Sequence, residues 1–315
     1  MADIDSGAID TCETTKDAAS SNLSLEPSAI SYKRPDDLRL FEKLEALKGH
    51  LRAFSNVAVA YSGGVDSTLL LAVAHDVLGD NVIAFTATLA TSPAREQHDA
   101  NAFCASRGIR QVVFAPPIME DPLFTANGPD RCYHCKRAIF SQLIDLAHDN
   151  GISNVVDGSN ADDLTDFRPG EKAISALGVK SPLRDCDLTK QDVRDISRRL
   201  GLPTWNKPAL ACLASRIAYG IPLTAERVML VDAAEQALLE SGFSNVRVRL
   251  AMNTRTEGAS GNYTARIEVP PAEFAKMLDP SLRNHIVEAL KELGFIYITL
   301  DLQGYRTGSM NESLL

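Results

Sequence analysis

The chain has 315 residues, 45% of them hydrophobic and 23% charged, which indicates a globular protein of one large domain or two ordinary ones. No apolar run approaches the roughly 20 residues of a membrane-spanning helix, which argues against a membrane protein. The formal net charge of -9 argues against a surface that binds nucleic acid.

Residues 1–34 are rich in Ser, Ala and Asp, and the first 30 hold six acidic residues against one lysine, Lys16. They have neither the basic start nor the apolar stretch of a signal peptide, so we expect a disordered acidic tail and a cytoplasmic protein. In that compartment the six cysteines of the chain indicate thiols, metal ligands or catalytic groups rather than disulfides.

An amphipathic helix is predicted over 35–54, where apolar residues recur at helical spacing. The apolar run from Val57 then predicts a buried parallel strand, and Ser62-Gly63-Gly64 breaks it before an apolar helix that runs to Leu78. A strand, a glycine turn and a helix N-terminus together attract phosphate, because backbone N–H groups and the helix dipole face it. Asp66 would cap this helix or hold Mg²⁺.

Three more buried strands are predicted along this half of the chain, over 82–88, 111–115 and 154–158. Helices alternate with them: one has Ser92 as its N-cap with Pro93 in its first position and runs to about Arg107, and another covers 133–149. Residues 116–130 read as a loop. Alternating strands and helices predict an α/β fold with a doubly wound parallel sheet.

A helix with a capping box starts at Thr189, and the pattern changes after Pro222. Beyond this point we predict a helix from Thr224 to Ser241, paired strands over 245–250 and 264–269, a helix over 271–293 and a last strand over 295–300. This order indicates a smaller α+β domain, so we expect an α/β domain over 35–221 and a C-terminal substrate and oligomerisation domain over 222–315. Residues 251–262 read as a polar loop.

The glycine turn is neither a Walker A loop nor a dinucleotide-binding fingerprint. Ser62-Gly63-Gly64-Val65-Asp66-Ser67 resembles the PP-loop of the ATP-pyrophosphatase superfamily, although a tight glycine-rich turn is the simpler alternative. The resemblance implies an adenine nucleotide alpha hydrolase-like fold that cleaves ATP between its α and β phosphates. Ser62, Gly63, Gly64, Asp66 and Ser67 would then hold the phosphates and Mg²⁺.

Two further segments are candidates for the same nucleotide site. The end of the second strand, Thr86 to Thr88, would take the adenine, because ligands bind at the carboxyl ends of parallel strands. Asp162 and Asp163 follow the fourth strand and would organise the metal, unless they are a solvated acidic turn.

Two cysteines, Cys132 and Cys135, form a C-x-x-C at a predicted helix start, where the helix dipole and Lys136 would favour thiolates. Half a zinc site, a redox pair and two core cysteines remain alternatives. A third sulfur, Cys212, lies between Lys207 and Arg216, although a lone cysteine is usually inert packing.

Several motifs together resemble the LarE family and cover nearly all of the chain after the tail. They are Ser62–Ser67, Asp157-Gly-Ser-Asn-Ala-Asp-Asp163, Arg168-Pro-Gly170, Lys207-Pro208, Ala211-Cys-Leu-Ala-Ser-Arg-Ile217 and Thr299–Asn311. The resemblance implies an ATP-dependent sulfurtransferase of nickel-pincer cofactor biosynthesis for lactate racemase. Its substrate would be pyridinium-3,5-biscarboxylic acid mononucleotide, whose ring carboxylates are adenylated and then converted to thiocarboxylates.

The resemblance implies two possible sources of sulfur. Some members of the family sacrifice one cysteine, here Cys212, and others hold a [4Fe–4S] cluster with three. The presence of Cys132, Cys135 and Cys212 predicts the second kind, in which one iron stays free to carry a replaceable sulfide. Cys104 and Cys186 have no comparable context and are expected to be structural.

Arg247 and Arg249 alternate along one predicted strand and therefore share a face. The resemblance implies that they bind the substrate phosphate together with Arg216, and a solvated edge strand is the alternative. Further substrate contacts are expected from Arg168, Lys207 and Ser215, with Glu235, Glu268 and Asp301 as weaker candidates.

The resemblance also implies a homo-oligomer, a trimer of dimers with the C-terminal domain at the contact, and an external sulfide donor. Other interpretations remain. A tRNA thiolase would need a basic surface, an amidating synthetase would not need the three cysteines, and a nucleotide or cluster carrier would release no pyrophosphate.

Overall fold

The computed structural model describes residues 35–165, 169–208, 211–252 and 263–306. The predicted tail over 1–34, Arg168 and most of the predicted loop over 251–262 lie outside these residues. In the described part, no helix combines the length and the apolar character needed to cross a membrane.

Four parallel strands form the larger sheet, in the order β3-β2-β1-β4. They are β1 (Val57–Ala60), β2 (Val82–Ala87), β3 (Gln111–Phe114) and β4 (Val155–Val156). The chain runs outward from β1 to β3 and then returns to place β4 on the other side of β1. Ligands of open parallel sheets bind at the carboxyl ends of the strands where the order reverses, which here is between β1 and β4.

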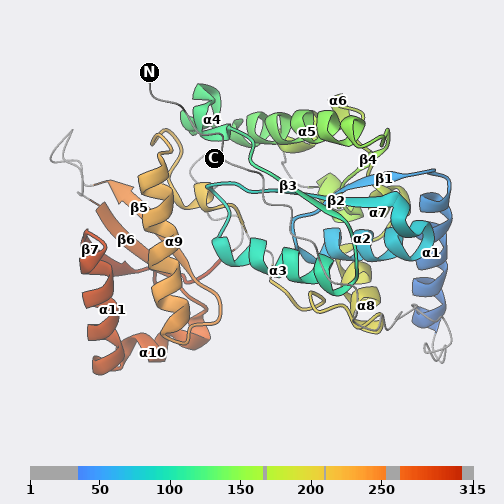
Figure 1. The fold of residues 1–315 in the computed structure, drawn as a ribbon. Coiled ribbons are helices and arrows are strands. Elements are labelled where there is room, and N and C mark those ends of the chain that lie inside the picture. The colour runs from blue at the N-terminus through green and yellow to red at the C-terminus, as the bar shows by residue number, and fades with distance from the viewer. Residues whose placement is uncertain (1–34, 166–168, 209–210, 253–262, 307–315) are drawn as a thin grey trace, which may run out of the picture. The chain divides into compact units, whose positions relative to one another are not determined.

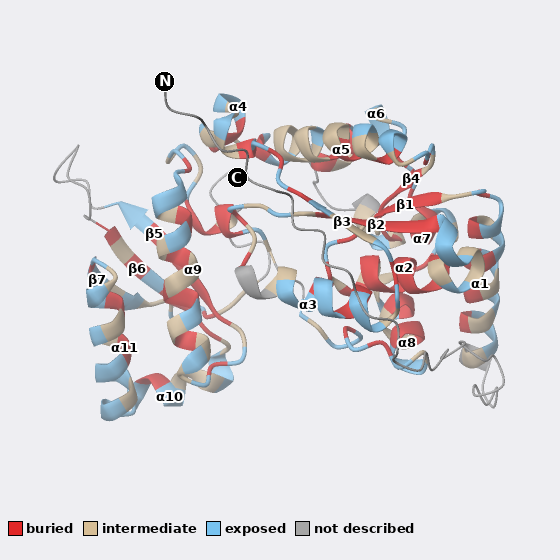
Figure 2. Cartoon of the chain, viewed as in Figure 1, coloured by how far each residue is buried: buried red, intermediate tan, exposed pale blue. Residues whose placement is uncertain are grey.

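Helices cover both faces of this sheet (Figure 1). They are α1 (Pro35–Arg52), α2 (Val65–Leu78), α3 (Ala94–Ser106) and α8 (Lys190–Arg199) on one face, and α5 (Arg131–Asp149) and α6 (Pro169–Ala176) on the other. Because strand side chains alternate, Val57 and Val59 pack with the first set while Ala58 packs with the second. Strands β1, β2 and β4 and most of α2 are accordingly buried (Figure 2), whereas β3 at the edge is more exposed, and the predicted doubly wound α/β sheet is confirmed.

A capping box begins α8, as predicted. The Thr189 hydroxyl accepts from the Asp192 amide N–H, and the Asp192 carboxylate accepts from the Thr189 amide N–H. The same carboxylate is buried and pairs with Arg39 and Lys43 of α1. It therefore joins two helices of one core.

A smaller mixed sheet has the order β5-β6-β7, with β5 and β6 antiparallel and β6 and β7 parallel. Its strands are β5 (Arg247–Met252), β6 (Tyr263–Glu268) and β7 (Phe295–Leu300). Packed with them are α9 (Ala225–Glu240), α10 (Phe274–Leu278) and α11 (Pro280–Glu292). Thr224 caps α9 through a hydrogen bond from the Arg227 amide N–H, as the sequence predicts.

Several local predictions are wrong. The helix after β2 begins at Ala94 with Pro93 as its N-cap, so Ser92 does not cap it. The helix predicted over 271–293 is broken at Asp279, because Asp279 caps a new helix that has Pro280 in its first position. The loop predicted over 116–130 contains α4 (Pro122–Thr125), and α7 (Pro182–Asp185) is a further short helix that the sequence pattern did not reveal.

Candidate functional site

The loop after β1 brings backbone groups to the carboxyl end of the sheet. Gly63 has a φ of 71°, a conformation that favours glycine, and a Cβ there would approach the Ala100 Cβ at 3.2 Å. Gly64 is the N-cap of α2 and no described side chain caps this helix, so Asp66 does not do so. Uncapped N–H groups at a helix start are suited to bind an anion.

The segment after β4 packs directly against this loop. A Cβ on Gly158 would lie 2.9 Å from the Ser67 amide nitrogen, so only glycine allows the approach. Asn160 then donates from Nδ2 to one oxygen of Asp66 at 3.1 Å, and the Lys190 ammonium contacts the other oxygen. We call the loop 62–64, the first turn of α2, and the segment 157–163 the PP-loop side.

The other residues predicted to bind the nucleotide lie in the segment after β4 and at the end of β2. Asp162 accepts from the Lys190 amide N–H at 2.8 Å, and Asp163 accepts from the Asn160 amide N–H at 2.9 Å. Both acids therefore shape the turn. Thr86 is buried and accepts from Gln111, whereas Thr88 is exposed just beyond the end of β2.

Lys207 also reaches the PP-loop side. Its ammonium lies 3.3 Å from the Gly63 carbonyl oxygen and 3.1 Å from an Asp99 carboxylate oxygen. The predicted role of Lys207 in substrate binding is untested, and its position is beside the glycine turn.

The three cysteines come from two distant segments. Cys132 and Cys135 lie in the first two turns of α5, and Cys212 precedes the short 3₁₀ helix η5 (Leu213–Arg216). Cys132 and Cys212 are exposed, and Cys135 is half-buried. Among the described residues, no three His, Cys, Asp or Glu side chains lie close enough together to hold a metal ion.

The three thiols nevertheless act on one another electrostatically. Burial raises the pKa of Cys135 to about 12, and negative charge on Cys212 and Cys132 adds to this effect against the opposing charge of Lys136. Cys132 remains accessible, but partial desolvation by its neighbours also raises its pKa, and Cys212 contributes. Lys136 lowers both pKa values, in the direction that the sequence predicts, but desolvation has the larger and opposite effect.

Hydrogen bonds fix the turn that carries Cys212 at two ends. The Leu213 amide N–H donates to the Thr91 carbonyl beyond β2 at 2.8 Å. On the other side Arg216 donates from Nη1 to the Ala211 carbonyl at 2.7 Å and to the Ser215 hydroxyl at 3.1 Å, and Arg249 donates to the Ser215 carbonyl at 2.5 Å.

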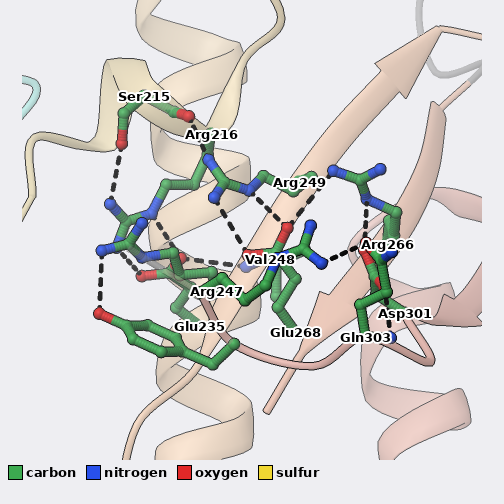
Figure 3. A network of polar contacts seen from close by, with 12 residues as sticks. Ser215, Arg216, Glu235, Arg247, Val248, Arg249, Arg266, Glu268, Asp301 and Gln303 are labelled. Atoms are coloured by element: carbon green, nitrogen blue, oxygen red, sulfur yellow. Dashed lines mark hydrogen bonds and ion pairs between the residues drawn. The ribbon is translucent and has the colours of Figure 1, made fainter. Parts of the chain in front are cut away.

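Buried ion pairs surround the Arg216 end of the Cys212 turn (Figure 3). Arg216 and Glu235 form a bidentate pair at 2.7 and 3.0 Å, and Arg249 and Glu268 form another at 2.9 and 3.0 Å. All four side chains are at most 5% exposed. Glu235 also accepts from the Val248 amide N–H, which joins α9 to β5.

Arg247 differs from these two arginines. It is buried on the same face of β5 as Arg249, and it donates to the Tyr305 hydroxyl at 2.9 Å while its guanidinium lies 4.6 Å from the centre of that ring. Burial lowers the pKa of Arg247, Tyr305 opposes this, and the charges of Arg216 and Arg249 add to it. We call Arg216, Glu235, Arg247, Arg249 and Glu268 the arginine network.

Comparison with known proteins places these features in a family. The model of the asparagine synthase family matches residues 42–126. The pyridinium-3,5-bisthiocarboxylic acid mononucleotide synthase of Lactiplantibacillus plantarum is 38% identical over 276 residues, 87% of this chain and 96% of that protein. The chain belongs to the LarE family.

Two uncharacterised proteins extend the LarE comparison to other lineages. One from Synechocystis is 40% identical over 275 residues, 87% of this chain and 99% of that protein. One from Methanocaldococcus jannaschii is 27% identical over 269 residues, 84% of this chain and 98% of that protein.

Several contacts in this LarE site were not predicted from the sequence. Arg247 and Arg249 are buried, so the solvated edge strand considered for them is wrong. Lys190 and Asn160 were not singled out, although both contact Asp66. Asp301 lies near the exposed Arg266, 3.6 Å from its Nε, rather than beside Arg247. No local motif marks Lys190, because its contact joins residues 124 positions apart.

Proposed function

We propose that this protein uses ATP to convert the ring carboxylates of pyridinium-3,5-biscarboxylic acid mononucleotide into thiocarboxylates, in biosynthesis of the nickel-pincer cofactor of lactate racemase. The family relationship supports the reaction. The observation that carries the proposal is the Cys212 turn, which is hydrogen-bonded to the loop beyond β2 at one end and to the arginine network at the other. A sulfur there would lie between a nucleotide and an anionic substrate.

The first half-reaction would take place at the PP-loop side. A substrate carboxylate oxygen attacks the α-phosphorus of ATP, the bond to the bridging oxygen breaks, and pyrophosphate leaves. We assign the phosphates to Ser62, Gly63, Gly64 and Ser67, because the glycine turn and the uncapped start of α2 present N–H groups. Adenine would lie beside Thr86 and Thr88.

Mg²⁺ suits the donors of the PP-loop side, because carboxylate oxygens are its preferred protein ligands. Asp66 would hold the ion, with Asp162 and Asp163 in support, and Asn160 orients the Asp66 carboxylate. Bound Mg²⁺ would neutralise charge on the phosphates as pyrophosphate leaves.

The substrate phosphate would bind at the arginine network. Arg216 and Arg249 are each neutralised by a buried glutamate, whereas Arg247 pairs with a neutral phenol and keeps the charge that an anion needs. We therefore assign Arg247 as the primary phosphate anchor, with Arg249, Arg216, Ser215 and Glu235 holding the Cys212 turn around the substrate. Arg168 and Lys207 stay predicted contacts.

The second half-reaction needs a sulfur nucleophile that attacks the acyl-adenylate carbon and expels AMP. The three thiols suit a [4Fe–4S] cluster in number and donor type, but in the described structure they do not lie close enough together to hold a metal ion, so binding would have to draw them together. Bound there, such a cluster would offer one iron without a protein ligand, on which sulfide can be carried and replaced. In the alternative, Cys212 gives up its own sulfur and becomes dehydroalanine after one transfer.

An anaerobic preparation separates the two routes. We expect iron, acid-labile sulfide and pyrophosphate release with ATP and the pyridinium substrate, and we expect Cys132→Ala to lose iron while it keeps pyrophosphate release. The sacrificial route would instead give single-turnover sulfur transfer in Cys132→Ala, with loss of the mass of H₂S at Cys212. Absence of pyrophosphate release in the wild type would contradict the reaction itself.

We also propose a cytoplasmic homo-oligomer that receives sulfide from a separate donor. Exposed apolar side chains in the C-terminal region, Met229, Leu278 and Tyr297, support a contact there, since the first two are 63% and 71% exposed. Light scattering of the purified protein would test the assembly, for which we expect six chains, and a monomer would contradict it.

A further inference from the structure

Asn127 is a buried asparagine in a backbone conformation that few residues adopt. Its side chain is fully buried, and its φ is 56°. Asparagine tolerates this left-handed region because its short amide forms local hydrogen bonds. The residue precedes α5 and ends the segment that starts with α4.

The Asn127 amide binds the chain that follows the Cys212 turn. Nδ2 lies 2.8 Å from the Ile221 carbonyl oxygen, 2.9 Å from that of Ala218 and 3.3 Å from that of Ile217. The Gly220 amide N–H donates back to the Asn127 carbonyl at 3.1 Å. One side chain thus fastens residues 217–221 to the entrance of α5.

Arg131 completes the contact from the first residue of α5. It donates from Nη1 to the Asn127 Oδ1 at 2.6 Å, and its guanidinium lies 4.5 Å from the centre of the Tyr219 ring. Arg131 is buried, so both contacts are strengthened by the absence of water. Asn127, Arg131 and Tyr219 form what we call the Asn127 hub.

The residues of the Asn127 hub flank both cysteine segments in the sequence. Cys132 follows Arg131 directly and Cys135 comes one turn later, while Ile217 is five residues beyond Cys212. The same contacts therefore connect both cysteine segments.

We propose that Asn127 and Arg131 are positioning residues that hold the Cys212 turn against the start of α5 so that the three thiols can meet. The use of the thiols in sulfur transfer rests on the proposed function, but their mutual position does not. It can be measured in full-length protein that holds no cluster.

The test uses reduced, cluster-free protein and a series of bismaleimides of increasing span, with peptide mapping to quantify links between Cys212 and either cysteine of α5. We compare the wild type with Asn127→Gly, which keeps the left-handed backbone and removes the amide. The matched control is Asp187→Gly, at an exposed residue with a φ of 54°. Stabilisation by ATP in thermal unfolding reports on the PP-loop side in each variant.

We expect Asn127→Gly to form the shortest link about tenfold less than the wild type, because several buried hydrogen bonds are lost. Stabilisation by ATP should be unchanged, and Asp187→Gly should link normally. If Asn127→Gly does not fold, Tyr219→Leu takes its place, with an expected decrease of about two- to fivefold from the lost cation–π contact.

Normal linking in the folded variants would overturn the proposal, as would a wild type that links Cys212 to neither cysteine of α5 at any span. Absence of iron from anaerobic protein would contradict the proposed cluster, but it would leave the proposed position of the three thiols unaffected. The two failures are therefore distinguishable.

Discussion

The PP-loop side and the arginine network are built in opposite ways. On the PP-loop side, glycines let backbone segments approach closely, and its charged side chains Asp66 and Lys190 are partly exposed. In the arginine network, two guanidinium–carboxylate pairs are almost completely buried and hydrogen-bond to the backbone around Cys212. The first depends on the close approach of backbone segments at glycines, and the second on paired charges.

This difference predicts which substitutions destabilise each region. A backbone-built site is damaged by added volume, and a partly exposed ion pair in it contributes little to stability. A buried ion pair is costly to break, because removal of one partner leaves the other charge desolvated. The substitutions below test this contrast in order of expected effect.

The largest effect is expected from Glu235→Gln in the arginine network. The substitution leaves the buried Arg216 without its counter-charge, and we expect a loss of about 3–5 kcal/mol in the free energy of unfolding, measured in urea. Glu240→Gln in the same helix is the control, since the Glu240 side chain is exposed and accepts a hydrogen bond from Gln236. For this control we expect a loss of less than about 1 kcal/mol in the free energy of unfolding. Equal losses in the two variants would contradict the contrast.

Gly158→Ala should damage the PP-loop side. The new Cβ would lie 2.9 Å from the Ser67 amide nitrogen, so α2 must shift at a cost of about 1–3 kcal/mol. ATP affinity, measured by calorimetry, should fall by about tenfold or more.

Gly49→Ala is the control for this substitution. Gly49 lies within α1 and a Cβ there meets nothing within 4 Å, so we expect a gain of about 0.5–1 kcal/mol in stability and normal ATP affinity. Unchanged ATP binding in Gly158→Ala would show that the close approach of the two segments is unnecessary.

Asp192 tests whether removing a buried, ion-paired carboxylate is also costly beside the larger sheet, as we expect for Glu235 in the arginine network. Burial opposes its charge, but hydrogen bonds from Lys43, Thr189 and Arg39 outweigh it and lower its pKa from 3.8 to about 2. Because the folded-state pKa is lowered, the stabilisation of about 2 kcal/mol is present above pH about 4 and is lost as the pH falls towards 2.

Asp192→Asn should therefore unfold more easily than the wild type at pH 7, and the difference should shrink in acid. Urea denaturation between pH 7 and pH 3 measures this, with the exposed Asp80→Asn as control. A difference that stays constant with pH would show that the charge of Asp192 is not responsible.

The smallest effect on stability is expected from Lys190→Gln. Its ion pair with Asp66 is partly exposed, so we expect a change below about 1 kcal/mol. Affinity for Mg²⁺–ATP should still fall by roughly tenfold, because a cation beside the phosphates is lost. The exposed Lys172→Gln serves as control, and equal affinities in the two variants would exclude Lys190 from the nucleotide site.

Local sequence signals predicted the elements whose causes are local. The β1–α2 turn, the capping box of Thr189 and the Thr224 cap each depend on residues a few positions apart, and the structure has all three. The break at Asp279 was missed because the apolar pattern continues past it, although Pro280 marks a helix start. Residues 122–125 were interpreted as loop since their Pro- and Gly-rich surroundings hide a short helix.

The sequence by itself determined the parallel sheet, the glycine turn and the three cysteines, because periodicity, glycine and cysteine are visible in short windows. Only the tertiary structure decided which charges are neutralised and which thiols are desolvated. Arg247 and Arg249 are two residues apart and chemically identical, yet one is paired with Glu268 and the other with Tyr305. Burial and pairing arise from contacts between distant segments, and such contacts leave no local pattern in the chain.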